Sequence, residues 1–425
     1  MKWRKSLSTM AESQHYPPLS RNRNFLLFLF GRGVSSLGDY FGNLALSWLV
    51  FAITSSALAL AFTWIVFMVP RSVIRLYGGV YVDRWNRRRI MLGTETSRAL
   101  LFGVIGVATF FNETPLLFIF ATAFTVGSLG ALFDLAADTV TPALVGKNRL
   151  LRANSTFTAT LQVDGVAGPA LAGVTIALFG TATALLVDSL SFVVLVSALL
   201  AISIPAANLI KQERRSWSRD FKEGFAYFRN RADLVWMSVV VSGANFGLGA
   251  FWYVYALIFA KDVLLSGSFG YGMLGTISSV GILTGVLYLG KIKRVRRKRL
   301  SIITSLFGMG TGLIVLAFTT TLPEALLAIF EFGLFVPFAD TITTVYYQET
   351  VPSTMLGRTF GFKRFIEFLT APVSVAFGAI IAGYFGVING ILFAGLVVIG
   401  SGLIGAFARP LKLLISVSPD SPEPG

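Results

Sequence analysis

Hydrophobic residues fill the chain in long runs, and each run ends at a few charged or turn-forming residues. A membrane-spanning α-helix needs roughly 20 mainly apolar residues. We therefore predict an all-α membrane protein with twelve transmembrane helices, at residues 24–52, 57–82, 90–111, 115–141, 153–179, 181–204, 234–260, 271–290, 300–321, 323–349, 360–385 and 387–408.

A polar segment at 205–233 separates the predicted helices into two sets of six. We expect an N-terminal bundle at 24–204 and a C-terminal bundle at 234–408, with polar tails at 1–23 and 409–425. The first tail lacks the apolar core and small-residue cleavage site of a signal peptide, so we expect it to stay attached.

Part of the polar segment has an amphipathic pattern. Phe221, Phe225 and Phe228 recur at helical spacing among charged residues. This spacing places the three rings on one face of a helix that could lie on the membrane surface. The alternative is that the segment is only a tether.

A short stretch of sequence recurs in the two predicted bundles. Residues 137–141 read Ala-Asp-Thr-Val-Thr, and residues 339–343 read Ala-Asp-Thr-Ile-Thr. Both stretches end the fourth predicted helix of their bundle. This agreement indicates two halves built on one repeat, as in many transporters.

Lys and Arg are distributed unevenly between the two sides of the predicted membrane. Of the 36, 31 lie in the tails and in the loops after the second, fourth, sixth, eighth and tenth helices. The alternate loops hold almost none apart from Lys261. Because basic loops stay on the cytoplasmic side, both termini are expected in the cytoplasm.

Composition agrees with this topology and excludes a soluble protein. Hydrophobic residues make up 54% of the chain and charged residues 13%, with a mean hydropathy of +0.72. The formal net charge of +15 would suggest nucleic-acid binding in a soluble chain. Here the excess of basic residues follows from topology, and we expect no nucleic-acid partner.

Several kinds of chemistry are missing from the sequence. The chain has no Cys, and its only His is His15 in the N-terminal tail. Disulfides, thiolate metal sites and histidine proton relays in the membrane are therefore excluded. No phosphate-binding Gly-Lys-Ser/Thr loop occurs, which leaves an ion or substrate gradient as the energy source. We expect no metal, no cofactor and no enzyme activity.

The loop between the second and third predicted helices carries a recognisable motif. From Gly79 it reads G-x-x-x-D-R, ending at Arg84, and Arg87 and Arg88 follow. This motif resembles the signature loop of the major facilitator superfamily of transporters. In that family the loop lies on the cytoplasmic side and helps to hold the two halves together.

Further stretches resemble the exporter branch of that superfamily, whose members carry drugs, macrolides or siderophores such as enterobactin. Leu-Leu-Arg-Ala-Asn-Ser at 150–155 and Leu-Gly-Asp at 37–39 are similar to stretches of this branch. The Gly-Pro motif of its antiporters has a counterpart at 168–173, where Gly and Pro permit bending and close helix contact. Its bending residues are Gly168, Pro169 and Gly173.

The resemblance implies a function and a location. It implies a monomeric bacterial inner-membrane transporter that exports an amphipathic small molecule (a drug, macrolide or siderophore) in exchange for protons. The two bundles would rock about a cavity near the membrane midplane, with lipid around them.

The sequence departs from the family pattern at two places. Ala123 stands where many drug antiporters carry Arg, and the loop at 291–299 lacks the signature Asp.

The resemblance also implies a cytoplasmic gate. Asp83 of the motif would face the start of the eleventh helix. Arg87 would meet Asp138 or, one turn earlier, Asp134. A negative charge near a helix N-terminus is worth roughly 0.3–1 kcal/mol. The same residues would serve equally well in a static loop clamp. The gate residues are Gly79, Asp83, Arg84, Arg87, Arg88, Asp134, Asp138 and Arg358.

Asp39 is the first candidate for proton coupling, because an ionisable residue inside a span needs a partner or a wet cavity. It lies about 22 Å into the first helix when counted from Asn24. Arg32 stands two turns earlier on the same face. Desolvation would favour a protonated Asp39 and pairing with Arg32 an ionised one. Asp39 could instead serve only helix packing.

Other charges inside the predicted spans are candidates for substrate or proton contact. Glu331 lies about 12 Å into the tenth helix, and we expect it in the central cavity. Arg98 lies within a turn of Glu95, and the two could pair. Asp164, Asp188 and Glu367 are weaker candidates.

The central cavity is expected to be apolar and aromatic. The chain has 38 Phe, and five Trp and Tyr residues lie in or near spans, which suits an amphipathic substrate held by few polar contacts. Two other functions stay open, a lipid or lysolipid flippase and a non-transporting sensor or partner subunit. The aromatic residues are Trp48, Trp64, Trp252, Tyr253 and Tyr255.

Overall fold

The computed structural model describes most of the chain as helices joined by short turns, and no strand occurs among the described residues. These are residues 18–78, 82, 85–146, 149–203, 217–292, 295 and 297–413, without the side chains of 217–222, 353–354, 357–358, 361, 364–365, 367–368 and 412–413.

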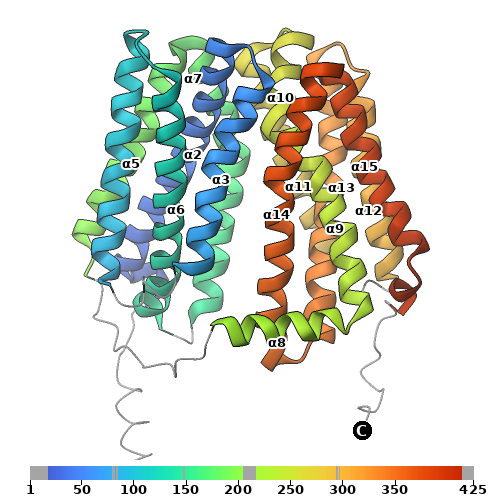
Figure 1. Ribbon diagram of the computed structural model, residues 1–425. Helices are drawn as coiled ribbons and strands as arrows, with labels where there is room; N and C mark the ends of the chain where they lie inside the picture. Colours follow the sequence, from blue (N-terminus) through green and yellow to red (C-terminus); the bar gives the residue numbers. More distant parts are fainter. Residues whose placement is uncertain are drawn as a thin grey trace, which may run out of the picture.

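Long apolar helices build two halves that stand side by side (Figure 1). The first half contains α2 (Arg23–Thr54), α3 (Ala57–Tyr77), α5 (Arg87–Phe110), α6 (Leu116–Val145) and α7 (Leu150–Ala201). The second contains α9 (Ala232–Ala250) continuing as η3 (Phe251–Tyr255), α10 (Ala256–Ile258) and η4 (Phe259–Val263), then α11 (Gly267–Lys291), α12 (Lys298–Ala317), α13 (Leu322–Thr350), α14 (Ser353–Phe385) and α15 (Val387–Phe407).

The twelve predicted membrane spans are confirmed within the described residues. Ten helices are long and apolar enough to cross a membrane. One of them, α7, is two spans, because Gly180 breaks it with φ 84° and ψ 167°. The apolar segment Leu369–Phe385 of α14 supplies the remaining span. Six spans lie in each half.

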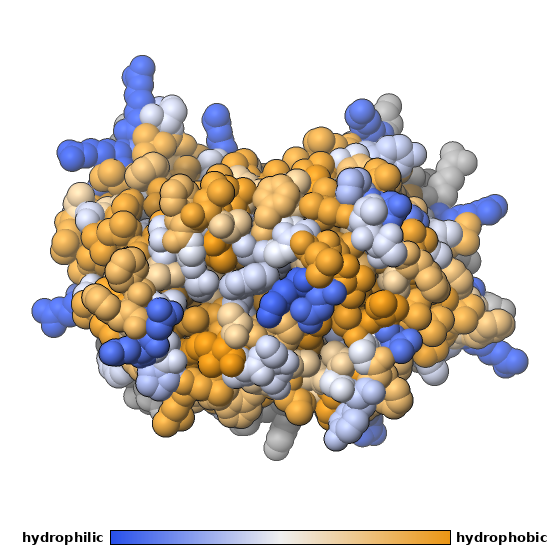
Figure 2. All heavy atoms as spheres, turned by 90° about the horizontal axis from the view of Figure 1, so that it is seen from above, coloured by the Kyte–Doolittle hydropathy of each residue, from blue (hydrophilic) through white to orange (hydrophobic). Residues whose placement is uncertain are grey.

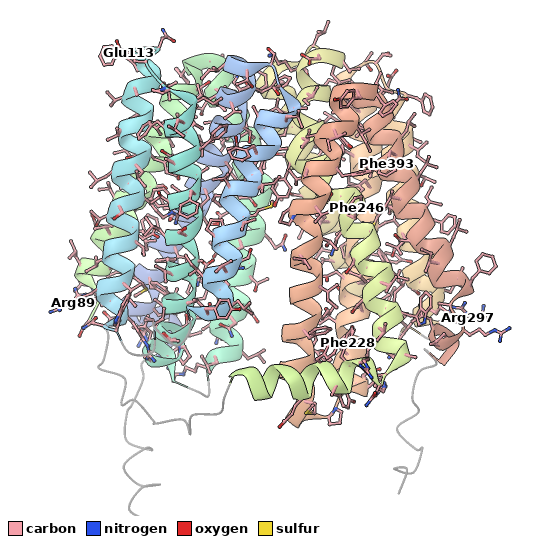
Figure 3. All side chains as sticks on the ribbon, viewed as in Figure 1. Arg89, Glu113, Phe228, Phe246, Arg297 and Phe393 are labelled. Carbon is pink, nitrogen blue, oxygen red and sulfur yellow. The ribbon has the colours of Figure 1, made fainter. Side chains whose placement is uncertain are left out.

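The spans begin and end at two opposite faces of the molecule. We name one the α8 face, after the short helix α8 (Trp217–Arg229) that lies across it. Arg89, Phe228 and Arg297 mark this face in Figure 3, and Glu113 marks the opposite one, which we name the far face.

Local sequence explains where several helices begin. Asn22 caps α2, because its side chain accepts a hydrogen bond from the Phe25 N–H at 3.1 Å. Asn86 caps α5 in the same way. A capping box starts α13, in which the Thr321 side chain accepts from the backbone N–H of Glu324 and the Glu324 side chain accepts from the backbone N–H of Thr321. Such caps satisfy N–H groups that have no partner inside the helix.

An arginine in each half caps the C-terminal end of that half's last span, and the two arginines occupy matching positions of the internal repeat. Arg88, at the start of α5, donates to the carbonyl oxygens of Leu199 and Leu200, the latter at 2.8 Å. Arg299, at the start of α12, donates to the last carbonyls of α15. In both halves the third span therefore neutralises the negative C-terminal end of the sixth.

The linker contributes α8, which packs on the second half. Phe225 and Phe228 lie 5.2 and 4.8 Å from the ring of Phe362 in α14, measured between centroids. Phe228 is buried although it lies in a helix rich in charged residues. The apolar side of α8 is thus attached to a transmembrane helix.

Glycines bring α2 very close to the second span of α7. A Cβ atom built on Gly38 would overlap Ser191, and one built on Gly42 would overlap the carboxylate of Asp188. Small residues permit such close helix contact in a membrane, where van der Waals packing is a main source of stability. This contact brings polar groups of α7 against the backbone of α2.

We predict that Gly42→Ala lowers stability by about 1–3 kcal/mol, because an extra methyl group must force α2 and α7 apart. Gly93→Ala is the matched control, since no atom lies within 4 Å of its added Cβ. The measurement is the thermal unfolding midpoint in detergent. Equal midpoints for the two variants would contradict the close contact.

Candidate substrate cavity and buried charge cluster

A cavity of about 350 Å³ lies between the two halves. Tyr40 and Asn43 line it from the first half, and α11 and α13 close the opposite side with Ser278, Ser279 and Phe332 among others. No acidic or basic side chain lines it among the described residues. Its aromatic walls come from Tyr40, Trp64, Trp252, Tyr253, Tyr271 and Phe332.

Two polar atoms in this wall make no hydrogen bond within the protein. The Trp64 Nε1–H and the Ser278 hydroxyl are both buried. Buried donors without partners are rare, and each is costly to leave unpaired. They therefore lie beside the cavity as unpaired donors that the surrounding side chains cover.

A second hollow of about 650 Å³ lies between α5 and the second span of α7. Its lining is mostly apolar, with Leu100, Val104 and Val107 on α5, all of them exposed. These side chains suit contact with lipid tails.

Thr276 joins the two halves in the part of α11 that lines the cavity. Its hydroxyl accepts a hydrogen bond from the Ala170 N–H at 2.9 Å and donates one to the Val166 carbonyl at 2.8 Å. In an unbroken α-helix those two backbone groups would pair with each other. A side chain from the second half thus enters the hydrogen-bond ladder of α7, next to Pro169.

Small residues make this junction close. Gly173 and Gly272 face each other so tightly that a Cβ on Gly173 would lie 3.1 Å from the Gly272 Cα and 2.6 Å from the Ser268 carbonyl oxygen. The Ser268 hydroxyl donates to the Gly173 carbonyl at 3.2 Å. Seen from the far face, the surface is continuous where the halves meet (Figure 2).

Aromatic contacts add to the closure of the far face. The rings of Trp64 and Tyr253 lie 4.8 Å apart between centroids. The ammonium of Lys261 lies 4.5 Å from the centroid of the Phe51 ring, which is a cation–π contact between the halves. Tyr253 and Lys261 belong to the π-helical segments η3 and η4. Such segments occur frequently at functional sites.

A cluster of charged side chains is buried inside the first half. The Arg98 guanidinium donates to Asp39 Oδ1 at 2.5 Å and to both oxygens of Glu95, at 3.1 and 3.3 Å. It also lies 4.1 Å from the centroid of the Phe192 ring. Glu95 and Arg98 are 0% and 6% exposed. The cluster therefore ties α2, α5 and α7 together.

Asp188 is the third carboxylate of this cluster. It is fully buried on α7 and interacts electrostatically with Asp39, Glu95 and Arg98. The Ser191 hydroxyl donates to the Asp188 carbonyl oxygen at 2.7 Å and also lies 3.2 Å from its Oδ1, whereas Oδ2 has no hydrogen-bond partner. Three carboxylates thus surround one cation.

A family model described as transmembrane secretion effector matches residues 13–414, almost the whole chain. The chain belongs to this family of the major facilitator superfamily. It is therefore a transporter rather than an enzyme.

Curated relatives of this transporter cover nearly all of its length. It is 26% identical to macrolide efflux protein A of Streptococcus pyogenes over 397 residues, which are 90% of this chain and 95% of that protein. It is 23% identical to the staphyloferrin A transporter of Staphylococcus aureus, over 93% of this chain and 97% of that protein.

A solved transporter structure has the same fold. A bacterial homologue of the human lysosomal transporter Spinster, crystallised in an inward-facing and occupied conformation, superposes with a TM-score of 0.74. The match covers 95% of this chain and all of the other, with 10% identical residues.

The sequence left open whether Arg32 pairs with Asp39. In the structure the two residues do not pair. Among the described ion pairs Asp39 binds Arg98, while the Arg32 guanidinium lies 5.4 Å from the centroid of the Phe157 ring. Seven residues separate the two positions by about 10 Å along the helix. Arg98 of the neighbouring α5 therefore lies closer to Asp39 than Arg32 does.

Asp164 and Glu331 have different environments in the transporter. Asp164 is buried, accepts a hydrogen bond from Ser36 and lies near Tyr40 of the cavity wall. Glu331 was expected in the central cavity, and its role there stays a prediction. It accepts a hydrogen bond from Thr311 of α12 at 3.3 Å and is not among the residues that line the 350 Å³ cavity. The Glu367 side chain lies outside the described residues.

The predicted gate is only partly within the described structure. Gly79, Asp83 and Arg84 lie outside the described residues, as does the Arg358 side chain. Arg88 caps α7, as described above.

Asp134 has a different partner from the predicted Arg87. It pairs with Arg71 at 2.8 Å and with Arg75, both of α3. Both arginines reach Asp134 from the neighbouring helix, so the acid is already neutralised. The pairing of Arg87 with Asp138 stays a prediction.

The residues that bend α7 have a further role in contact between the halves. Gly168 packs against the ring of Tyr40, where a Cβ would lie 2.5 Å from Cδ2. Pro169 lines the cavity and presents its carbonyl oxygen to Gly272. Sequence reasoning missed Thr276, because a Thr in an apolar helix gives no sign of a partner on another helix.

We predict that Thr276→Val shifts the transporter away from the state with a closed far face, because two hydrogen bonds between the halves are lost. Two bonds at about 1 kcal/mol each correspond to roughly a tenfold or larger change in population. Spin labels on cysteines introduced at Ser55 and Ser266 would report the distance across this face.

Thr284→Val is the control for that measurement, because Thr284 is exposed on the same helix and bonds only its own backbone. Identical label distances in Thr276→Val and the unmutated background would show that Thr276 does not hold the far face closed.

We predict that Arg98→Gln destabilises the protein by about 3–5 kcal/mol, because it leaves buried carboxylates without a cation. Adding Glu95→Gln recovers part of this loss, since one unpaired carboxylate is removed. Arg32→Gln, which loses only a ring contact, costs about 1 kcal/mol or less. Thermal unfolding in detergent measures all three. An Arg98→Gln variant as stable as Arg32→Gln would refute the cluster's structural role.

Proposed function

We propose that this transporter exports an amphipathic small molecule from a bacterial cell in exchange for protons. The observation that carries the proposal is the pairing of a neutral aromatic cavity with a charge cluster on adjacent residues of one helix. Tyr40 lines the cavity, and Asp39 beside it binds Arg98. The substrate site and the proton site are thereby linked through α2.

The distribution of basic residues supports the orientation. The α8 face carries α8 and the basic ends of α5 and α12, so by the positive-inside rule it faces the cytoplasm of the cell membrane. The tails at 1–23 and 409–425 would lie on the same side. The far face would then be extracellular.

The cavity supports an amphipathic substrate. Its walls offer aromatic rings and a few donors, such as the Trp64 indole N–H and the Ser278 hydroxyl. Because no described charged group lines it, charge recognition is not its basis for binding. The names of two relatives, a macrolide efflux protein and a staphyloferrin A transporter, support export of a drug or siderophore.

The contacts between the halves support alternating access. Gly272 and Lys261 join the halves toward the far face, and Thr276 joins them beside the cavity. Export requires these contacts to open after the α8 face has closed, so that residues 24–204 rock against residues 234–408 around the cavity. The loop with Asp83 and Arg84, together with Arg87, Asp138 and Arg358, is our candidate for closing the α8 face.

Asp39 supports proton exchange. Its side chain is 41% exposed while it binds a guanidinium that is almost fully buried. It therefore has access to water and to the cluster at once. Protonation of Asp39 removes the charge that holds Arg98 to α2, which changes the packing of α2 against α5.

We predict that Asp39→Asn abolishes uphill export and retains substrate binding. For one-to-one exchange, a gradient of one pH unit sustains at most about tenfold accumulation of a neutral substrate, whereas an uncoupled carrier reaches no accumulation. The assay is uptake into inside-out proteoliposomes of a macrolide, a lipophilic cation, a catechol siderophore and a lysolipid.

Glu113→Gln is the matched control, because Glu113 is exposed at the far end of α5. It should accumulate substrate like the unmutated protein. Accumulation by Asp39→Asn that still follows the pH gradient would overturn Asp39 as the coupling residue. Gradient-independent movement of the lysolipid alone would favour a flippase.

A further inference from the structure

The buried cluster has more carboxylates than cations. With every group ionised, Asp39, Glu95 and Asp188 would give three negative charges against the one positive charge of Arg98. Buried charges without a partner are strongly disfavoured, and a carboxyl group in that position takes up a proton instead. Each proton taken up lowers this excess of negative charge by one, so we expect at least one carboxyl group of the cluster to be protonated.

The hydrogen bonds identify where the proton lies. Asp39 and Glu95 each accept a hydrogen bond from Arg98, which stabilises their ionised forms. Asp188 accepts none from Arg98. Its Oδ1 bonds Ser191, and its buried Oδ2 has no partner and lies against Gly42. Asp188 is thus the least favourable position in the cluster for a negative charge.

A second unpaired atom lies on the cation. The Arg98 Nε–H is buried and donates to no group. The cluster therefore contains both an unused donor on Arg98 and an unused acceptor on Asp188, and these two residues interact electrostatically.

Neighbouring helices do not supply another cation to these carboxylates. Asp134 of α6 also acts on Glu95, but Arg71 and Arg75 of α3 neutralise it. Arg32 of α2 stacks on a ring of α7. Among the described residues, Arg98 is the cation that the three carboxylates share.

We propose that Asp188 is a second proton-binding residue, and that one proton alternates between Asp188 and Asp39 while Arg98 pairs with whichever is ionised. This inference rests on the proposed proton exchange. In the present state the proton is on Asp188, and Arg98 pairs with Asp39.

The transfer conserves charge within the cluster. Asp188 gives up its O–H proton and becomes a carboxylate, and Asp39 gains one proton and becomes neutral. Arg98 then leaves Asp39 and bonds Asp188 through Nε. Because Asp39 is the water-exposed member, the proton is exchanged with solvent there. The same step releases α2 from α5 and fixes Arg98 to α7.

Infrared difference spectroscopy of the full-length protein in lipid bilayers tests this assignment without any substrate. We expect the unmutated protein at neutral pH to show the C=O band of a protonated carboxylic acid. Asp188→Asn removes it, and Glu95→Gln retains it. Asp39→Asn also weakens it, because Arg98 is freed to pair with Asp188. Asp262→Asn, an exposed acid of the far face, leaves it unchanged.

Ser191→Ala gives an independent readout if Asp188→Asn does not fold. Loss of the hydroxyl that bonds Oδ1 should move the C=O band to higher wavenumber. A full band in Asp188→Asn, or an unmoved band in Ser191→Ala, would overturn the assignment to Asp188. A full band in Asp39→Asn would overturn the alternation.

The proposed function and this inference fail in different ways. Absence of gradient-driven accumulation by unmutated protein would refute proton exchange, whatever the spectrum shows. Normal accumulation together with a band that does not depend on Asp188 would refute the present inference alone.

Discussion

The ion pair between Arg98 and Asp39 is the interaction on which the first half of this transporter depends. It joins α5 to α2 within the membrane-spanning part of the protein, where the almost fully buried guanidinium must find its partners among protein groups. Glu95 and the Phe192 ring complete the surroundings of the guanidinium. A buried ion pair contributes little net stability, yet breaking one is costly. Such a pair is suited to switching, because protonation of a single partner changes which contact is favourable.

The geometry of the helices makes that switch relevant to transport. Gly38 and Gly42 let α7 approach α2 until the Asp188 carboxylate lies against its backbone. On the other side of α2, Tyr40 lines the cavity and packs on Gly168 of the same helix α7. The α7 helix then reaches the second half through Thr276. These contacts form a direct path from the cluster to the cavity and to the junction between the halves, which the proposed exchange would use.

Sequence reasoning predicted the fold well and the site only in part. The spans follow from hydropathy, which depends on the membrane rather than on neighbouring helices. Asp39 was identified because an acid within a span is costly. Its partner was not identified, because Arg98 reaches it only when α5 packs on α2. The role of Glu331 stays a prediction, since a residue count gives depth in the membrane but not the direction of the side chain. The role of Thr276 depends on a contact between halves that no local pattern reveals.

The central claim is that the proposed export is coupled to proton release from this cluster, and proton release from the purified transporter tests it most directly. The unmutated protein in weakly buffered detergent solution would receive a macrolide, with binding measured in parallel by quenching of Trp fluorescence. Our account predicts release of about one proton for each molecule bound near neutral pH, declining at high pH where the cluster is already deprotonated. Binding without proton release at any pH would contradict it.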